Sequence, residues 1–199
     1  MDVNYGRLIR LREDAKEKGE PILRDKSFEL LISTVKARRP EKILEIGVNV
    51  GLSGIGMLLA SDNSSLTGIE IDEEKIRSAN ENYASFGVSD RVKIFCGDAS
   101  EIIPLLGGKY DFIFLDGPKG HYGQYCADLL RVLSVGGILF ADNVLYRGYV
   151  GKNKTAPHKH ATIKHGMEKF LETVTGAENL KTVVYELEDG VSVTEKLYD

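Results

Sequence analysis

The chain has 199 residues and a mass of 22.0 kDa, which suits a single globular domain. Hydrophobic residues make up 42% of it and charged residues 28%, so the composition excludes a mainly disordered protein. Lys and Arg number 26 against 30 Asp and Glu, and the resulting net charge of −4 excludes the strongly basic character of a general nucleic-acid-coating protein.

The cysteines and the N-terminus favour a cytoplasmic protein. Cys96 and Cys126 have no metal-ligand spacing and do not suggest a secreted disulfide framework, so we expect two reduced, largely buried thiols. Charges interrupt the first twenty residues, which lack the apolar stretch of a signal peptide. No apolar run is long enough to cross a bilayer, and we expect no membrane partner.

Helical and strand-like periods alternate along the chain. A helix is expected over residues 25–38, capped by Asp25 or Ser27 and stopped by Pro40. Five buried strands are expected after it, at residues 42–47, 66–71, 91–98, 110–116 and 136–143. The helices between them are expected at residues 52–61, 72–87, 100–106 and 119–133, with Asp72 as a cap and Gly87 as a stop.

The end of the chain follows a different pattern. A helix over residues 162–174 precedes two strand-like runs, residues 180–187 and 190–197, whose separation is typical of a hairpin. The whole pattern predicts an α/β fold with a doubly wound, mostly parallel seven-stranded sheet and a C-terminal antiparallel hairpin.

A glycine-rich turn joins the first strand to the next helix. Gly47, Gly51 and Gly54 permit a tight turn and close approach of a ligand, but the turn is not the dehydrogenase GxGxxG. Glu70 ends the second strand 23 residues beyond Gly47, where a carboxylate accepts hydrogen bonds from ribose hydroxyls. Glu45, two residues before Gly47, suits a positively charged ligand better than a pyrophosphate, or accepts amide hydrogens of its own loop.

The segments LEIGVNVGLSG, GIEID, FCGDASEIIP, FIFLDGPKGHY and GGILFADNVL resemble the class I S-adenosylmethionine-dependent methyltransferases, and more narrowly the catechol and caffeoyl-CoA O-methyltransferase family with its small bacterial members. The resemblance covers residues 22–196. It implies a Rossmann-like methyltransferase domain over residues 1–199, with an N-terminal helical segment (1–40) and a cofactor-binding and catalytic core (41–199). The cofactor-binding residues that it implies are Glu45, Gly47, Asn49, Gly51, Ser53, Glu70, Asp98, Ala99, Ser100 and Asp116.

Three oxygen-bearing side chains follow the fourth and fifth strands. Asp116 ends one strand, and Asp142 and Asn143 end the next, so their side chains should meet at the carboxyl edge of the sheet. Hard oxygen ligands favour Mg²⁺, with Mn²⁺ or Ca²⁺ as alternatives, over zinc. The same three positions match the family's divalent metal site. Asp98 and Lys119 also have plainer interpretations, as a helix cap and an exposed lysine.

Lys119 matches the position of the family's catalytic base, beside Asp116. A phenolic or enolic hydroxyl has a pKa near 10, so little of it is ionised at neutral pH. A divalent cation lowers that pKa and a lysine with a depressed pKa accepts the proton, after which the oxygen attacks the sulfonium methyl group. We therefore expect an O-methyltransferase with Lys119 and Asp116 in catalytic roles.

The acceptor stays open at this point. Residues 146–165 form a basic stretch with Gly and Pro, typical of a mobile loop or a solvated surface, at the family's acceptor loop. Such a loop suits an anionic acceptor such as RNA or a coenzyme A thioester. The resemblance to the small bacterial members implies 5-hydroxyuridine in tRNA as one acceptor, and a catechol-like small molecule is the competing one. A Rossmann-type nucleotide-dependent oxidoreductase and a non-catalytic S-adenosylmethionine-binding module are the alternatives. Relatives frequently pair, so we expect a homodimer.

Overall fold

A computed structural model describes residues 3–151 and 156–199. The chain divides into two compact units, Met1–Asp98 and Ala99–Asp199, which are described in turn.

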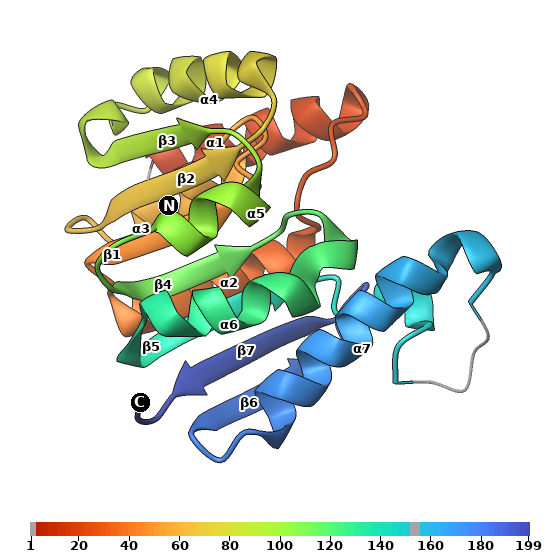
Figure 1. The fold of residues 1–199 in the computed structure, drawn as a ribbon. Coiled ribbons are helices and arrows are strands. Elements are labelled where there is room, and N and C mark those ends of the chain that lie inside the picture. The colour runs from red at the N-terminus through yellow and green to blue at the C-terminus, as the bar shows by residue number, and fades with distance from the viewer. Residues whose placement is uncertain (1–2, 152–155) are drawn as a thin grey trace. The chain divides into compact units, whose positions relative to one another are not determined.

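The first unit combines helices with a parallel three-stranded part of the sheet. Its elements are α1 (Val3–Glu17), α2 (Asp25–Arg38), β1 (Lys42–Ile46), α3 (Leu52–Ala60), β2 (Ser65–Glu70), α4 (Glu73–Ser85), the 3-10 turn η1 (Ser89–Arg91) and β3 (Val92–Cys96). Strand β2 lies between β1 and β3 and is parallel to both, with Glu45 opposite Gly68 and Glu70 opposite Cys96 (Figure 1). The carboxyl ends of these strands therefore lie at one edge.

The helix termini of this unit agree with the sequence at α4 but not at α2. Asp72 caps α4, because its Oδ1 accepts hydrogen bonds from the amides of Glu74 and Lys75 at 2.8 and 3.2 Å. The expected cap of α2 was wrong: Arg24 occupies the cap position without a side-chain hydrogen bond, and Asp25 is the first helical residue. Its carboxylate instead pairs with the Lys16 ammonium at 2.6 Å, which joins α2 to α1.

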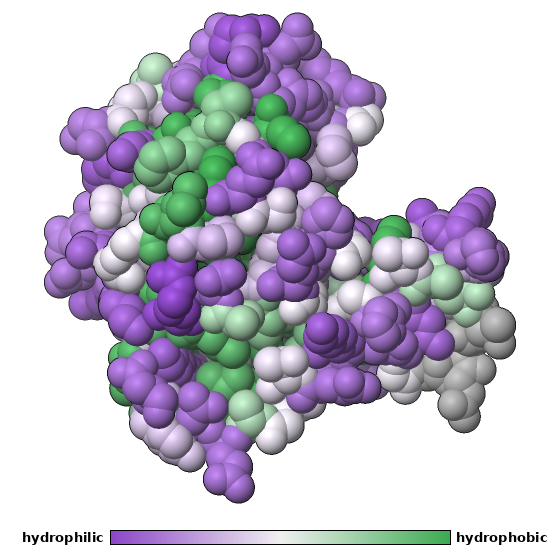
Figure 2. All heavy atoms as spheres, viewed as in Figure 1, coloured by the Kyte–Doolittle hydropathy of each residue, from purple (hydrophilic) through white to green (hydrophobic). Residues whose placement is uncertain are grey.

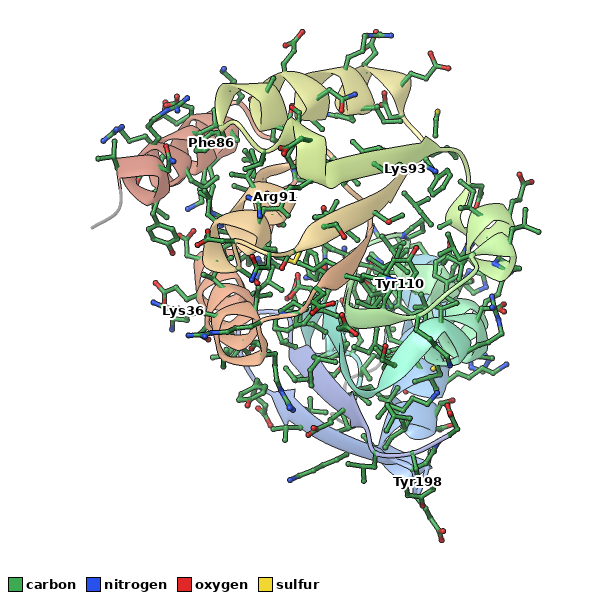
Figure 3. The ribbon with its side chains drawn as sticks, turned by 90° about the vertical axis from the view of Figure 1, so that its left-hand side faces the viewer. Lys36, Phe86, Arg91, Lys93, Tyr110 and Tyr198 are labelled. Atoms are coloured by element: carbon green, nitrogen blue, oxygen red, sulfur yellow. The ribbon has the colours of Figure 1, made fainter. Side chains whose placement is uncertain are left out.

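One arginine holds the end of α3. The Nη1 atom of Arg91, labelled in Figure 3, donates to the carbonyl oxygens of Leu58, Ser61, Asp62 and Ser64 at 3.0–3.4 Å. A cation beside these carbonyls satisfies groups that a helix end leaves unbonded and complements the helix dipole.

The second unit carries the rest of the sheet. Its strands are β4 (Tyr110–Leu115), β5 (Leu133–Asp142), β6 (Leu180–Tyr185) and β7 (Val191–Lys196). Its helices are α5 (Ala99–Ile102), α6 (Tyr122–Val132) and α7 (Ala161–Gly176). Short 3-10 turns are η2 (Ile103–Leu105), η3 (Lys119–His121), η4 (Tyr146–Gly148) and η5 (His158–His160).

Strand pairing in this unit confirms the predicted hairpin. β4 and β5 are parallel, with Leu115 opposite Ala141, whereas β7 is antiparallel to both β5 and β6. The strand order of the mixed seven-stranded sheet is β3-β2-β1-β4-β5-β7-β6. The predicted fold class, a mostly parallel sheet that ends in an antiparallel hairpin, is therefore confirmed.

Two predicted boundaries shift in the second unit. The helix expected from Lys119 begins as the turn η3, and α6 proper starts at Tyr122. Strand β5 begins at Leu133, earlier than expected, and so takes up the end of the predicted helix. Helices α6 and α7 lie side by side (Figure 1), and Gly123 and Gly166 are at their contact.

The cysteine expectation was partly wrong. Cys126 is buried, but Cys96 is exposed at the end of β3. Figure 2 shows a face on which patches of apolar residues lie among hydrophilic ones. The most exposed large apolar side chains among the described residues are Leu105 (84%), Val3 (79%) and Ile71 (65%). Among residues 3–151 and 156–199, no helix has the length and apolar character that a membrane span requires.

Candidate active site

The glycine turn of the first unit is held by backbone hydrogen bonds. Gly47 and Gly51 have φ angles of 88° and 80°, in the left-handed region that favours glycine. The Gly47 amide donates to the Ile69 carbonyl at 3.0 Å, which extends the β1–β2 pairing into the turn. Asn49 also has a positive φ, of 49°. Because glycines occupy these positions, a small-molecule ligand can approach the backbone of the turn closely.

Glu70 fastens this turn to the tip of β2. One carboxylate oxygen accepts the Asn49 amide at 2.8 Å. The other accepts the amides of Ile71 and Asp72 at 2.9 and 3.1 Å. A carboxylate has about four acceptor positions, so three are already used by the backbone and about one remains for a ligand.

Glu45 lies behind the turn. Its side chain is fully buried. A Cβ built on Gly54 would lie 2.2 Å from the Tyr83 hydroxyl and 2.8 Å from Glu45 Oε2, so the absence of a side chain at Gly54 lets these two groups meet. Burial, reinforced by the charge of Glu45, raises the pKa of Tyr83 well above its ordinary value. Tyr83 therefore keeps its proton and can donate to Glu45.

The connection between α1 and α2 also contacts the turn. The Asn49 side-chain amide donates to the Pro21 carbonyl at 3.0 Å. Next to it, the Glu20 carboxylate pairs with the Lys75 ammonium of α4 at 2.6 Å. Asn49 therefore anchors the turn through both its backbone and its side chain.

The remaining expected cofactor residues lie at two helix starts. Ser53 is half-buried in the first turn of α3. Asp98 and Ser100 flank Ala99, the first residue of α5. The Gly97 amide donates to the Glu70 carbonyl at 2.9 Å, so the chain before Asp98 lies beside the tip of β2.

In the second unit, two carboxylates lie at the ends of adjacent strands: Asp116 follows β4 and Asp142 is the last residue of β5. Because Leu115 is opposite Ala141 in parallel strands, the next residues, Asp116 and Asp142, lie side by side. The Asp142 residue is 3% exposed, and the Asp116 side chain is 21% exposed. Burial, followed by the charge of Asp142, raises the pKa of Asp116 from 3.8 to about 7.

Asn143 completes the expected set. It follows Asp142 directly, is 9% exposed and has a φ of 60°, a conformation that Asn tolerates. No group of three or more His, Cys, Asp and Glu side chains suited to a metal occurs among the described residues. The site expected from the sequence consists of two carboxylates and one amide.

Lys119 lies at the same edge of this unit. Its Nζ is 4.0 Å from Asp116 Oδ1, and its side chain is 32% exposed. The ammonium charge acts to lower the pKa of Asp116, against the larger effects of burial and Asp142. The Lys119 and Asp116 side chains are both partly exposed, so a ligand can reach them. The lysine nitrogen is a group that can exchange a proton beside the carboxylate.

Tyr122 packs beneath the end of β4, a role that the sequence did not predict. Its ring is fully buried against Phe170 of α7, with centroids 5.6 Å apart. Its hydroxyl donates to the Leu115 carbonyl at 3.0 Å, one residue before Asp116. His121, also left out of the expected site, contacts the Tyr125 hydroxyl through Nδ1 at 3.3 Å.

The described parts of the basic stretch are more structured than a mobile loop. The Tyr146 hydroxyl lies 2.9 Å from His160 Nδ1, and the Tyr149 ring stacks on His160 at 5.7 Å. Tyr146 and Arg147 have φ angles of 32° and 56°. The basic residues Lys152 and Lys154 lie outside the described residues, whereas Lys159 and Lys164 lie in η5 and α7.

A doubly wound sheet with a glycine turn after the first strand and acidic residues at the ends of later strands is typical of proteins that bind a nucleoside-containing ligand at the carboxyl ends of the strands. Comparison with known proteins gives the family. The O-methyltransferase family model matches residues 18–197. The chain therefore belongs to the O-methyltransferase family.

Individual relatives agree with this assignment. A caffeoyl-CoA O-methyltransferase from Stellaria longipes is 31% identical over 129 residues, which are 61% of this chain and 54% of that protein. A catechol O-methyltransferase from Niastella koreensis is 30% identical over 174 residues, 84% of this chain and 77% of that protein. The chain thus spans about half the length of the plant relative.

A solved structure shares the fold. The O-methyltransferase TomG from Streptomyces achromogenes, in complex with S-adenosylmethionine, has a TM-score of 0.84 with this structure at 23% identity. The comparison covers 98% of this chain and 90% of that one. At that level of identity the likeness concerns the fold.

Proposed function

We propose that this protein is an S-adenosylmethionine-dependent O-methyltransferase that transfers a methyl group to an acidic hydroxyl and depends on a divalent cation. The observation that carries the proposal is the group formed by Asp116, Asp142 and Lys119 at the carboxyl edge of β4 and β5, in a chain of the O-methyltransferase family. The paired carboxylates provide a cation site and the lysine provides a proton acceptor, and hydride transfer needs neither.

In this proposal the residues that follow strands β1, β2 and β3 bind the donor. The cradle of Gly47, Asn49, Gly51 and Ser53 takes the methionine end, with Glu45 behind it. Glu70 keeps about one acceptor position for a ribose hydroxyl. Asp98, Ala99 and Ser100 take the adenine. Ile71, 65% exposed beside Glu70, adds an apolar surface for that ring.

The residues of the second unit fit a divalent cation. Two adjacent carboxylates, one nearly buried, raise each other's cost of ionisation, and a cation between them offsets that cost. Asp116, Asp142 and Asn143 supply hard oxygen ligands, which suit Mg²⁺ first and Mn²⁺ or Ca²⁺ next. Such a cation would act as a Lewis acid that lowers the pKa of the acceptor hydroxyl.

Lys119 has the role of general base. As the neutral amine, its Nζ takes the proton from the acceptor hydroxyl and becomes an ammonium, and the resulting oxyanion attacks the methyl carbon of the sulfonium. A carbon–oxygen bond forms as the carbon–sulfur bond breaks, and its electron pair leaves with S-adenosylhomocysteine. Asp116 orients the lysine from 4.0 Å. Alignment of the oxygen with the methyl group contributes much of the rate.

Two acceptor classes fit the segment after Asp142. The half-buried rings of Tyr149 and His160, stacked with centroids 5.7 Å apart, offer a planar surface, and nearby basic residues favour an anionic acceptor. This favours 5-hydroxyuridine in tRNA over a neutral catechol-like molecule. We also propose that the protein acts in the cytoplasm as a homodimer, which light scattering of the purified protein would test.

A labelled-methyl assay tests the proposal. The purified protein is incubated with methyl-labelled donor and either tRNA lacking the modification or catechol, each with Mg²⁺ or a chelator. We expect label in an acceptor only with metal. Donor binding without transfer to either acceptor would favour a non-catalytic binding module, and reduction of a nicotinamide cofactor would favour an oxidoreductase.

Lys119→Ala tests the base directly. General-base removal costs about 10²–10⁴-fold in turnover, so we expect a loss of at least about 100-fold with the donor dissociation constant within about twofold of the original. Lys36→Ala is the matched control, because Lys36 is exposed on α2 (Figure 3). Equal turnover in the Lys119 and Lys36 variants would contradict the role of Lys119.

A further inference from the structure

The turn that carries Lys119 rests on α7 through two glycines. A Cβ built on Gly166 of α7 would lie 2.4 Å from the carbonyl oxygen of Gly120, 2.9 Å from its carbonyl carbon and 3.3 Å from its Cα. Ordinary contacts of a Cβ begin at 3.4 Å. Gly166 therefore lets the backbone of η3 lie directly on the helix.

The neighbouring residues make the same contact continuous. Gly120 would meet Thr162 and Ile163 of α7 at 3.9–4.0 Å if it carried a Cβ, which is ordinary packing. Gly123, in the first turn of α6, would meet the Gly166 carbonyl at 3.1 Å. The contact is thus tightest at Gly166 and relaxes on either side of it.

The other supports of η3 come from its own side of the unit. The His121 amide donates to the Pro118 carbonyl at 2.9 Å, and the His121 ring contacts Tyr125 of α6. These interactions fix the conformation of η3 but not its distance from α7. That distance depends on how closely the backbones at Gly120 and Gly166 approach.

From this packing we infer that Gly166 is a positioning residue for Lys119: its bare backbone sets where η3 lies and so places the Lys119 ammonium beside Asp116. This inference rests on the proposed function for the consequence in catalysis, but the packing claim stands by itself. A methyl group at position 166 must displace η3 by about 1 Å, the difference between 3.4 and 2.4 Å. A displacement of that size in a catalytic group costs up to about 100-fold in rate.

Hydrogen exchange tests the packing claim without any assay of activity. In Gly166→Ala we expect the amides of residues 119–121 to exchange at least about tenfold faster than in the original protein. Gly176→Ala is the matched control, because Gly176 ends the same helix and a Cβ there would meet nothing within 4 Å. Equal exchange in η3 of the two variants would overturn the inference.

Turnover then tests the consequence for Lys119. We expect Gly166→Ala to lower kcat by about 10–100-fold on whichever of tRNA and catechol is methylated, with donor affinity within about twofold. In a Lys119→Ala background the same change should alter kcat less than twofold, because the lysine it misplaces is absent. An equal fold loss in both backgrounds would show a general structural effect and overturn the inference.

Two further outcomes can be distinguished from a failure of the packing inference: a variant that does not fold, and a failure of the proposed function. If Gly166→Ala does not fold, Gly123→Ala, with its milder contact, should show a smaller kcat loss of the same non-additive kind, and a normal kcat in it would overturn the inference. If neither acceptor is methylated or Lys119→Ala is fully active, the proposed function or the base role fails, while the exchange data still decide the packing claim.

Discussion

A methyl group added at Gly54 would collide with the buried pair behind the glycine turn. The added Cβ would lie 2.2 Å from the Tyr83 hydroxyl, 2.8 Å from Glu45 Oε2 and 3.1 Å from Leu66 Cδ1. Tyr83 and Glu45 are fully buried, so neither side chain has space to swing away. The hydroxyl or the α3 backbone must then move by about 1.2 Å, the difference between 3.4 and 2.2 Å.

The expected cost follows from overpacking. Forcing an extra methyl group into a packed core costs about 1–3 kcal/mol, and we expect Gly54→Ala to lower the free energy of unfolding by about 3 kcal/mol. Tyr83→Phe alone should cost about 1–2 kcal/mol, because it removes a hydroxyl that faces a buried carboxylate. Combining the two changes removes the worst collision, so the double variant should be more stable than the sum predicts by about 1–2 kcal/mol.

Urea unfolding of the four proteins at pH 7.5 measures this coupling. Gly6→Ala is the control, because a Cβ at Gly6 of α1 would meet nothing within 4 Å, and it should be neutral or slightly stabilising. Calorimetric titration with S-adenosylmethionine should show weaker binding in Gly54→Ala, since α3 follows the donor turn. Strictly additive costs in the cycle would refute the argument that Gly54 exists to let Tyr83 reach Glu45.

Other expected outcomes concern the thiols and Arg91. Under native conditions a thiol reagent should react quickly with one cysteine, the exposed Cys96, and with Cys126 only after denaturation; two fast thiols would contradict the burial. Burial raises the pKa of Cys126 from 9.0 to about 11, so its contribution to stability is complete below pH 9 and is lost as the pH rises through 11. The free energy of unfolding should accordingly fall less steeply between pH 9 and 11 in Cys126→Ala than in the original protein. An equal dependence of that free energy on pH in the two proteins would argue against a raised pKa of Cys126. Arg91→Ala should lower the free energy of unfolding by about 2 kcal/mol in urea, because it leaves several carbonyls at the end of α3 without their donor, with Arg91→Lys intermediate; an unchanged midpoint would show that water replaces the guanidinium at no cost.

Local signals in the sequence carried most of the fold. Strict alternation of apolar runs and helical periods gave the order of strands and helices, and the Asp72 cap and the hairpin around Glu188–Gly190 were predictable because each depends on residues close in the chain. The cap of α2 was not, because Asp25 is drawn away by Lys16 of another helix. The start of α6 was missed because a 3-10 turn shares the composition of a helix.

In the candidate site, too, some features were predictable from the sequence and others depend on contacts between distant parts of the chain. Asp116 and Asp142 were predicted to be neighbours, and the register of β4 and β5 places them side by side. Glu70 was assigned to a ligand, but its hydrogen bonds to three backbone amides are invisible in a sequence because they depend on how the turn closes. Tyr83, Tyr122 and Gly166 were missed because their roles come from packing between elements far apart in the chain.

We propose that Asp116, Asp142 and Asn143 hold a divalent cation for methyl transfer. Crystals grown with MnCl₂ and S-adenosylhomocysteine would locate that cation through anomalous scattering at the manganese edge. We expect one strong peak within coordination distance of oxygen atoms from all three side chains, and no such peak in Asp142→Asn. A fully occupied donor site with no manganese at these residues would show that they do not hold the cation.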